Sequence, residues 1–330
     1  MKINKLNLLT ILLISIAVIF LGFTVHDVFS PHDSTEHVVR IQQGDSALTI
    51  GKRLEEAGII SSAGRFRLLA KLRSKDRQLK PGTYVFGGNT SLWDTVSRLQ
   101  EGVSEQIRIT IPEGLSLHRT ILLIEASGLA DYDQLYAAAT DTALVRRITG
   151  LPLPSLEGYL YPETYLFPVP STPDSILALM GREFFRKMHL NGIEAYAEER
   201  FYQKLILASI VEKEAGNDDE RATVAGVFDK RLRLGMALQS CSTVDYILER
   251  RGIRREVLTT ADTEIESPYN TYQNPGLPPT PVSNPSIASI KAALNPEQHD
   301  FLYFFSDRKG NNVFSRSYQE HLNQQRKMHL

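Results

Sequence analysis

The chain has little that could build a covalent or metal-based framework. Its 330 residues include one cysteine, Cys241, which excludes an intramolecular disulfide and lacks the partners of a zinc or thioredoxin-type motif. Lys and Arg total 37 against 38 Asp and Glu, so no general basic field would attract nucleic acid. The sequence contains no P-loop and no G-x-G-x-x-G, G-x-S-x-G or H-E-x-x-H motif. We therefore expect no metal ion, no cofactor and no nucleic-acid partner.

One long hydrophobic run lies near the N-terminus. Residues 8–25 are mostly apolar, and 18 residues in a helix are long enough to cross a bilayer core. Lys2 and Lys5 precede this run, so the positive-inside rule predicts a cytoplasmic tail at residues 1–7. No small-x-small cleavage site follows, which favours an anchor over the alternative of a cleaved signal peptide. We expect a single-pass inner-membrane protein with a periplasmic catalytic domain, although a Gram-positive envelope would be compatible with the same residues.

After a polar linker at residues 26–37, the chain repeats a short pattern. A strand over residues 38–41 and a turn precede an amphipathic helix over 47–57, and a matching helix covers 117–126 seventy residues later. The two copies align without a gap at four pairs of positions: Gly44 and Gly114, Ser46 and Ser116, Leu54 and Ile124, and Gly58 and Gly128. A strand after a turn near residue 82 and a helix over 91–100 lie between them. Small units of this kind recur in carbohydrate-binding modules, and purely structural spacers are the alternative.

The remainder of the chain, residues 149–330, predicts a larger α+β domain. Two proline clusters, at residues 151–173 and 268–285, should form fixed irregular segments. The periodicity predicts helices over 175–190, 202–215 and 219–234, a hairpin over 301–315 and a last helix that begins at the capping box Ser317-x-x-Glu320. Since no parallel βαβ pattern occurs, the fold class is α+β throughout.

One of these helices combines burial with a carboxyl group. Residues 202–215 are apolar almost all round, so this helix should be buried. Glu212 falls on the apolar stripe near the C-terminal end, whereas Glu214 points to roughly the opposite side. Burial and the helix dipole both disfavour the anion there, and a carboxyl that keeps its proton at neutral pH can act as a general acid. The alternative is that Glu212 emerges at the helix end and pairs with Lys213, Arg221 or Arg233.

Two aromatic, proline-rich segments could form the walls of a glycan cleft. One contains Tyr269–Tyr272 followed by Gly276–Pro279, and the other covers Glu157–Tyr165. Rings, amides and hydroxyls on stiff loops suit sugars, which bind by aromatic stacking and by sets of hydrogen bonds. Each segment could also be a rigid loop packed on the core, and composition alone leaves both alternatives open.

Together, these segments resemble the MltG (YceG-like) family of endolytic murein transglycosylases. The similarity is strongest at residues 208–214 (ASIVEKE), 224–239, 269–279 and 302–304. The resemblance implies a membrane anchor, a LysM-like region at 38–148, a catalytic domain at 149–330, and Glu212 as the catalytic acid. We take the following residues as candidates for substrate binding: Glu157, Tyr161, Glu163, Gln239, Ser240, Thr243, Asn270 and Tyr272.

The chain departs from the family pattern at one place. Where many members have Gln-[Ser/Thr]-Asp-Pro-Thr-Val, residues 239–244 are Gln-Ser-Cys-Ser-Thr-Val. This difference argues against a second catalytic carboxylate at that position.

The resemblance implies a lyase that needs only one carboxyl group. The acid would protonate the oxygen between N-acetylmuramic acid and N-acetylglucosamine and then accept the proton of the muramic C6 hydroxyl, which closes a 1,6-anhydro ring. The expected partners are peptidoglycan glycan strands and penicillin-binding-protein synthases near the membrane. A muramidase that uses water and a non-enzymatic wall-binding scaffold are the alternatives.

Overall fold

The computed structural model describes residues 28, 37–42, 44–73, 79–86, 90–102, 106–194, 199–255 and 257–328. The predicted membrane helix at residues 8–25 lies outside this range. Within the described ranges, no helix is both long and apolar enough to cross a membrane. The chain divides into two compact units, which are described separately: the first runs to Ile107 and includes Phe167–Pro170, and the second comprises Arg108–Leu166 and Ser171–Leu330.

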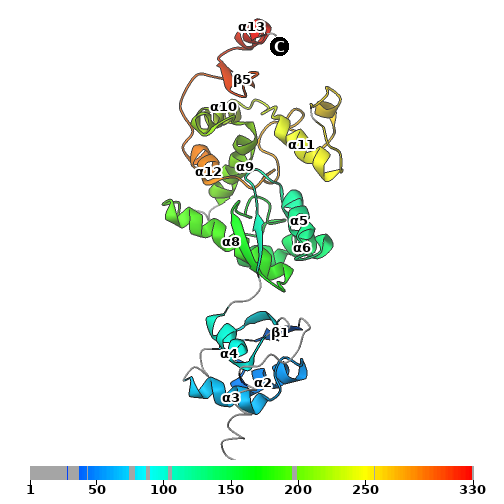
Figure 1. The fold of residues 1–330 in the computed structure, drawn as a ribbon. Coiled ribbons are helices and arrows are strands. Elements are labelled where there is room, and N and C mark those ends of the chain that lie inside the picture. Colours follow the sequence, from blue (N-terminus) through cyan, green and yellow to red (C-terminus); the bar gives the residue numbers. More distant parts are fainter. Residues whose placement is uncertain are drawn as a thin grey trace, which may run out of the picture. The chain divides into compact units, whose positions relative to one another are not determined.

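The first unit is a small α+β module. Strands β1 (His37–Ile41) and β2 (Gly82–Phe86) pair antiparallel, with Val39 opposite Tyr84. Between them in sequence come α2 (Ala47–Glu56) and α3 (Ala63–Leu72), and α4 (Leu92–Glu101) follows β2 (Figure 1). The apolar faces of these five elements meet in one core that contains fully buried Leu54, Phe66, Val96 and Leu99. The predicted strands and helices of this region are therefore confirmed.

The sequence repeat is also visible in the local structure. Ser46 and Ser116 both cap a helix by accepting a hydrogen bond from the backbone N–H three residues later. Gly44 and Gly114 precede these caps with φ of 92° and 72°, in the left-handed region that favours glycine. The division between the units falls at Ile107–Arg108, inside the range 38–148, so the two copies belong to different units.

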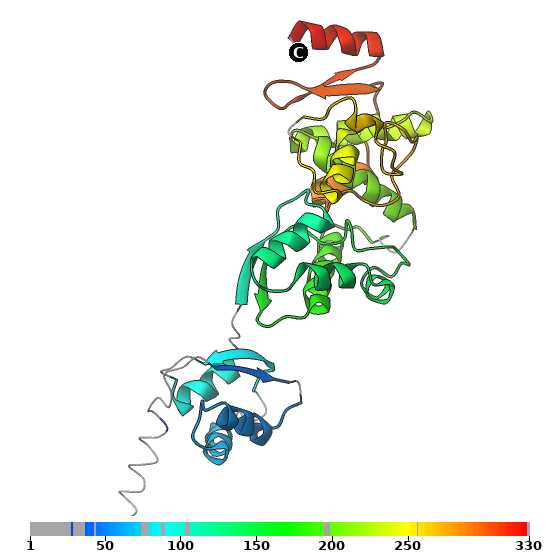
Figure 2. The same ribbon diagram turned by 90° about the vertical axis from the view of Figure 1, so that its right-hand side faces the viewer.

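The second unit contains most of the helices and two small sheets. Strands β3 (Gln106–Thr110) and β4 (Thr164–Pro168), most of whose residues belong to this unit, form one sheet, and β5 (Tyr303–Ser306) pairs antiparallel with β6 (Asn312–Ser315) in the other. The helices are α5 (Leu117–Ala126), α6 (Tyr132–Ala139), α7 (Thr142–Thr149), α8 (Pro173–Leu190), α9 (Glu199–Glu214), α10 (Arg221–Arg233), α11 (Cys241–Arg250), α12 (Ile287–Leu294) and α13 (Tyr318–Met328). In Figure 2, α13 lies beside the C-terminal hairpin. The α+β class is confirmed.

Helix α9 occupies the centre of this unit. Every residue from Leu205 to Val211 is buried, and α9 packs against α10, α11 and α12. The one polar side chain in this stretch is Ser209, and its buried hydroxyl is fully hydrogen-bonded. It donates to Ile206 O and accepts from Val282 N at 3.0 Å. The last proline-rich segment is thereby attached to α9. The prediction of a buried helix that ends in two glutamates is confirmed.

Candidate active site

Glu212 lies in a buried ion pair at the end of α9. Its side chain is 4% exposed, and Oε2 lies 3.1 Å from Nη1 of Arg221. Ser286 donates to the same oxygen from its backbone N–H at 2.8 Å and from its hydroxyl at 2.6 Å. Ser286 is also the N-cap residue of α12. Glu212 is therefore buried as predicted and pairs with Arg221 as the alternative held, and three donors compensate the charge of its carboxylate.

Glu214 points away from Glu212, towards the N-terminus of α11. Its Oε1 accepts hydrogen bonds from the Ser240 hydroxyl at 2.5 Å and from Ser242 N at 3.0 Å. At such a position a carboxyl oxygen satisfies a backbone N–H that the first turn of the helix leaves without an intrahelical partner. No residue that the structure describes donates to Oε2 of Glu214. The two hydrogen bonds to Oε1 thus orient the carboxyl group, and Oε2 remains available to a ligand.

A cleft of about 560 Å³ lies beside Glu214. One side of it is formed by Glu214 with four residues that follow α10 or precede α12: Gln239, Ser240, Cys241 and Tyr272. Residues of β5 and α13 line it as well. Because Gln239, Ser240 and Tyr272 are all candidate substrate-binding residues, the structure brings three of the predicted groups together around Glu214 and not around Glu212.

Gln239 has a strained backbone at this cleft. Its φ of 50° is the one positive value among the described non-glycine residues, and the left-handed region costs a residue with a Cβ atom about 1 kcal/mol. The Gln239 N–H donates to Thr271 O at 3.0 Å, which holds the turn. Arg231, beneath the turn, donates to Leu238 O at 2.8 Å. Strain that the surroundings enforce is typical of functional sites, and here it leaves the Gln239 side chain exposed at the cleft.

Two predicted binding residues support the cleft from inside. Thr243 is fully buried, and its hydroxyl contacts Ser240 O at 2.8 Å and the Thr271 hydroxyl at 2.9 Å. Asn270 is also fully buried, and its amide donates to Thr263 O and Ile265 O while its carbonyl accepts from Tyr272 N. These side chains shape the loop that carries Tyr272, so their contacts fit a positioning role and not direct contact with a sugar.

The predicted residues of the segment 157–165 lie in other surroundings. Glu157 is buried between helices, where Oε1 accepts from Leu117 N at 2.8 Å and Oε2 from the Tyr246 hydroxyl at 3.1 Å. Burial raises the pKa of Glu157 to about 8. Tyr161 is buried, with Nζ of Lys187 5.3 Å from its ring centroid. Glu163 pairs with that Lys187 Nζ at 2.6 Å, which lowers the pKa of Glu163. None of the three lines the cleft beside Glu214.

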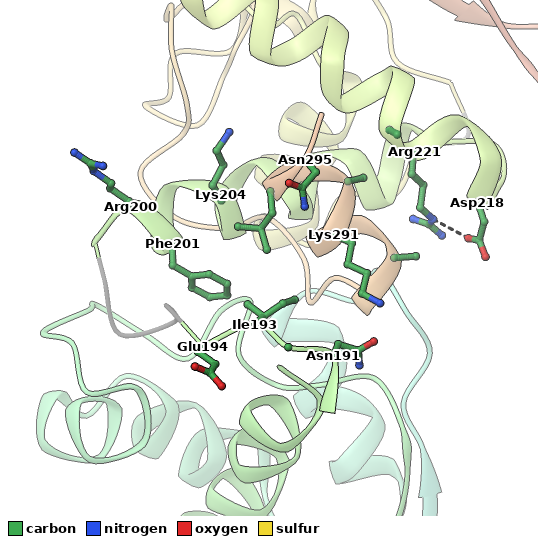
Figure 3. A pocket seen from close by; sticks show the side chains of 15 residues that line it. Asn191, Ile193, Glu194, Arg200, Phe201, Lys204, Asp218, Arg221, Lys291 and Asn295 are labelled. Carbon is green, nitrogen blue, oxygen red and sulfur yellow. Dashed lines mark hydrogen bonds and ion pairs between the residues drawn. The ribbon is translucent and has the colours of Figure 1, made fainter. Parts of the chain in front are cut away.

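A larger cavity, of about 750 Å³, lies on the Arg221 side of α9. Arg221 and Asp218, joined at 2.8 Å, occupy one end of it, and Phe201 and Arg200 lie towards the other (Figure 3). Its lining is mostly apolar carbons and basic side chains, and it contains none of the predicted substrate-binding residues. Among the described residues, no group of three or more His, Cys, Asp or Glu side chains is arranged to hold a metal ion.

The sequence pattern favoured Glu212, and not Glu214, as the catalytic acid. Helical periodicity correctly placed the two glutamates on opposite sides of α9. Which side faces the segments around Gln239 and Tyr272 depends on contacts 26 or more residues apart in the chain, such as Ser240 with Glu214. The sequence features that point to Glu214 are its position two residues nearer the helix end and the Gln-Ser pair in a later loop.

Known proteins share both the sequence and the fold. The model of the YceG-like family matches residues 39–327. An endolytic murein transglycosylase of Bacillus subtilis is 30% identical over 306 residues, which cover 86% of this chain and 82% of that protein. The enzyme of the same name from Streptococcus pneumoniae is 29% identical, and the match covers 86% of this chain but 56% of that protein.

A solved structure agrees with these matches. The crystal structure of a yceG-like protein from Listeria monocytogenes superimposes with a TM-score of 0.59 at 31% identity, and it covers 88% of this chain and 99% of its own. The family match extends through both compact units, from β1 to α13. On these grounds the chain belongs to the YceG-like family.

Proposed function

We propose that this protein is an endolytic murein transglycosylase, a lyase that cuts peptidoglycan glycan strands and leaves 1,6-anhydro-muramic ends. The names of its relatives in Bacillus subtilis and Streptococcus pneumoniae support this activity. The single observation that carries the chemistry is the position of Glu214, a carboxyl group that Ser240 and Ser242 orient by one oxygen beside a cleft with Gln239 and Tyr272.

Glu214 is the acid and base of the proposed reaction. Protonated, it donates its proton to the oxygen that links muramic C1 to the next sugar, and the C1–O bond breaks. The resulting carboxylate then takes the proton of the C6 hydroxyl as that oxygen bonds to C1. One carboxyl group serves both steps because the nucleophile belongs to the substrate, so no second acid is required. Glu212 was the residue predicted from the sequence, but its buried pairing with Arg221 suits it to positioning α9 against α10 and α12.

The location of the enzyme belongs to the same proposal. The apolar run at residues 8–25 would anchor the chain in the inner membrane with the catalytic unit in the periplasm. The strand-helix-helix-strand order of the first unit supports a LysM-like, glycan-binding role for it. An anchored enzyme meets strands as they are made, which makes penicillin-binding-protein synthases its proposed partners.

Analysis of the product ends tests the proposed activity. Incubation of the protein with nascent and mature peptidoglycan, followed by mass spectrometry, should show anhydro-muramic ends. Reducing ends would instead identify a muramidase that activates water. An absence of new ends with folded protein on both substrates would support the wall-binding scaffold.

A further inference from the structure

The C-terminal hairpin and helix carry a group of aromatic rings into the cleft beside Glu214. We call Tyr303, Phe305, Tyr318 and His321 the aromatic wall; all four line the cleft. The ring centroids of Tyr303 and Tyr318 lie 5.8 Å apart, those of Tyr303 and His321 5.7 Å, and those of Tyr318 and His321 6.3 Å with the planes 22° from parallel. The rings thus form one connected aromatic surface.

This surface is not explained by the stability of the fold. Tyr318 is 59% exposed, and α13 has no buried residue along its length. An aromatic side chain of this size contributes its large apolar area only when something covers it. His321 adds a second signal, because its Nδ1 is shielded from solvent and yet has no hydrogen-bond partner in the part of the chain that the structure describes. A sugar ring in the cleft would cover Tyr318, and it would satisfy Nδ1 once a turn of the imidazole brings that atom to the cleft surface.

The wall is held in a fixed position against the strained turn. Arg231 on α10 donates from Nε to Leu302 O at 2.7 Å, immediately before β5, and from Nη1 to Leu238 O at 2.8 Å, immediately before Gln239. Its guanidinium also lies over the ring of Tyr303, 5.1 Å from the centroid. At the other edge, the Ser315 hydroxyl of β6 contacts Gln324 of α13 at 2.5 Å. One arginine therefore joins the aromatic wall to the turn that carries Gln239.

Burial and the nearby Arg231 lower the pKa of His321, which favours the neutral form of the ring. A neutral imidazole has one nitrogen that donates and one that accepts. Nδ1 can therefore form a hydrogen bond with an uncharged hydroxyl or acetamido group, and a neutral ring does not require an anionic partner. The chemistry of the wall, flat apolar rings with a neutral polar atom, matches a hexosamine ring.

We propose that the aromatic wall is a sugar-binding subsite, in which one N-acetylhexosamine ring of the glycan strand stacks on Tyr318 and hydrogen-bonds to His321. The proposal rests on the glycan-cleaving function proposed above and names the residues that hold a sugar next to the scissile bond. It also gives α13 a direct role in substrate binding, because Tyr318 begins that helix.

Binding to an inert form of the full chain tests the subsite separately from catalysis. The Glu214→Gln protein would be titrated calorimetrically with a purified hexasaccharide of alternating N-acetylglucosamine and N-acetylmuramic acid. Adding Tyr318→Ala should weaken binding about tenfold, which corresponds to a loss of about 1.4 kcal/mol of stacking. Tyr318→Phe should stay within about twofold, because the ring remains. His321→Ala should also weaken binding.

Leu190→Ala is the matched control, since Leu190 at the end of α8 is 63% exposed and outside the cleft. Binding of the Tyr318→Ala protein as tight as that of the control, while the unmodified chain cleaves peptidoglycan, would overturn the subsite and leave the proposed function standing. An absence of both hexasaccharide binding and cleavage by the unmodified chain would overturn the function and the subsite together. Equal melting temperatures of the variants would show that the change in affinity is not a loss of folding.

Discussion

Glu212 and Glu214 are two residues apart on α9 but face different surroundings. Glu212 receives three donors from α10 and from the N-terminus of α12, all on Oε2. Glu214 receives two donors on one oxygen, and the cleft lies beside it. A buried ion pair contributes chiefly when it is complete, whereas a catalytic carboxyl needs one oxygen accessible to its substrate. The contrast supports the proposed roles, a structural one for Glu212 and a catalytic one for Glu214.

Gln239 permits a separation of backbone strain from side-chain chemistry. Gln239→Gly removes the left-handed cost of about 1 kcal/mol, so its melting temperature should equal or exceed that of the unmodified protein. Gln239→Ala keeps that cost and should not gain stability. Both variants lose the amide at the cleft, and cleavage of glycan should slow about tenfold in each, as for the loss of one hydrogen bond to substrate.

Thermal unfolding and cleavage rates of the two Gln239 variants check this prediction. The shared loss of rate measures the amide, and the difference in stability measures the backbone. Full activity in both variants would show that the amide does not contact the substrate.

At the scale of elements, Glu157 joins two helices through a carboxyl buried between them. It accepts from Leu117 N at the start of α5 and from Tyr246 on α11. Burial raises its pKa from 4.5 to about 8. The folded state therefore holds this proton more tightly than the unfolded chain, and the stability that results is complete below pH 4.5 and is lost as the pH rises to about 8.

The unfolding free energy should consequently fall between pH 5 and pH 8, by at most about 1.4 kcal/mol per pH unit from this group. Glu157→Gln should flatten that slope and be the more stable form at pH 8, because the amide has no charge to bury. Urea unfolding at four pH values measures both slopes. Glu163→Gln, at a partly exposed carboxyl, is the control that should leave the slope unchanged. Parallel slopes for Glu157→Gln and the unmodified protein would contradict the assignment.

Most elements that could be predicted from the sequence have a local signal, but a local signal was not always enough. Helices α2, α4 and α5 begin at serines that cap them, and the hairpin β5–β6 has its turn in the sequence. Helix α11 was missed because its first residues have no local side-chain cap, and the carboxyl of Glu214 from α9 satisfies Ser242 N instead. Helices α3, α7 and α12 were missed although side chains cap them locally, and α6, β3 and β4 were missed as well.

The same distinction applies to the site. Aromatic and polar residues around Tyr272 indicated a glycan cleft, and the apolar run of α9 indicated a buried helix with a glutamate at its end. The packing of α11 against α9 decides which glutamate reaches the cleft, and that packing comes from non-local contacts such as Ser240 with Glu214. Polar residues such as Glu157, Thr243 and Asn270 are typical of a binding loop. In the fold, however, their polar atoms form buried hydrogen bonds within the protein.

At the scale of the whole molecule, the two compact units predict a separable activity. Every contact described above at Glu214 and its cleft comes from the second unit. A fragment of residues 106–330 should fold and cleave soluble glycan oligomers with a kcat close to that of the full chain. The first unit and the N-terminal run should matter for wall binding and for nascent strands at the membrane. Loss of kcat on a short soluble oligomer by the folded fragment would show that the first unit takes part in catalysis.

The most direct test of the account compares Glu214→Gln and Glu212→Gln in parallel, with the yield of anhydro-muramic ends and the melting temperature measured for each. Glu214→Gln should keep its melting temperature and lose at least about a hundredfold in rate, the usual effect of removing a general acid. Glu212→Gln should melt at a lower temperature, because Arg221 loses its buried charged partner and keeps only the exposed Asp218, and it should still form anhydro ends below that temperature. A folded but inactive Glu212→Gln protein beside an active Glu214→Gln protein would contradict the account and return the catalytic role to Glu212.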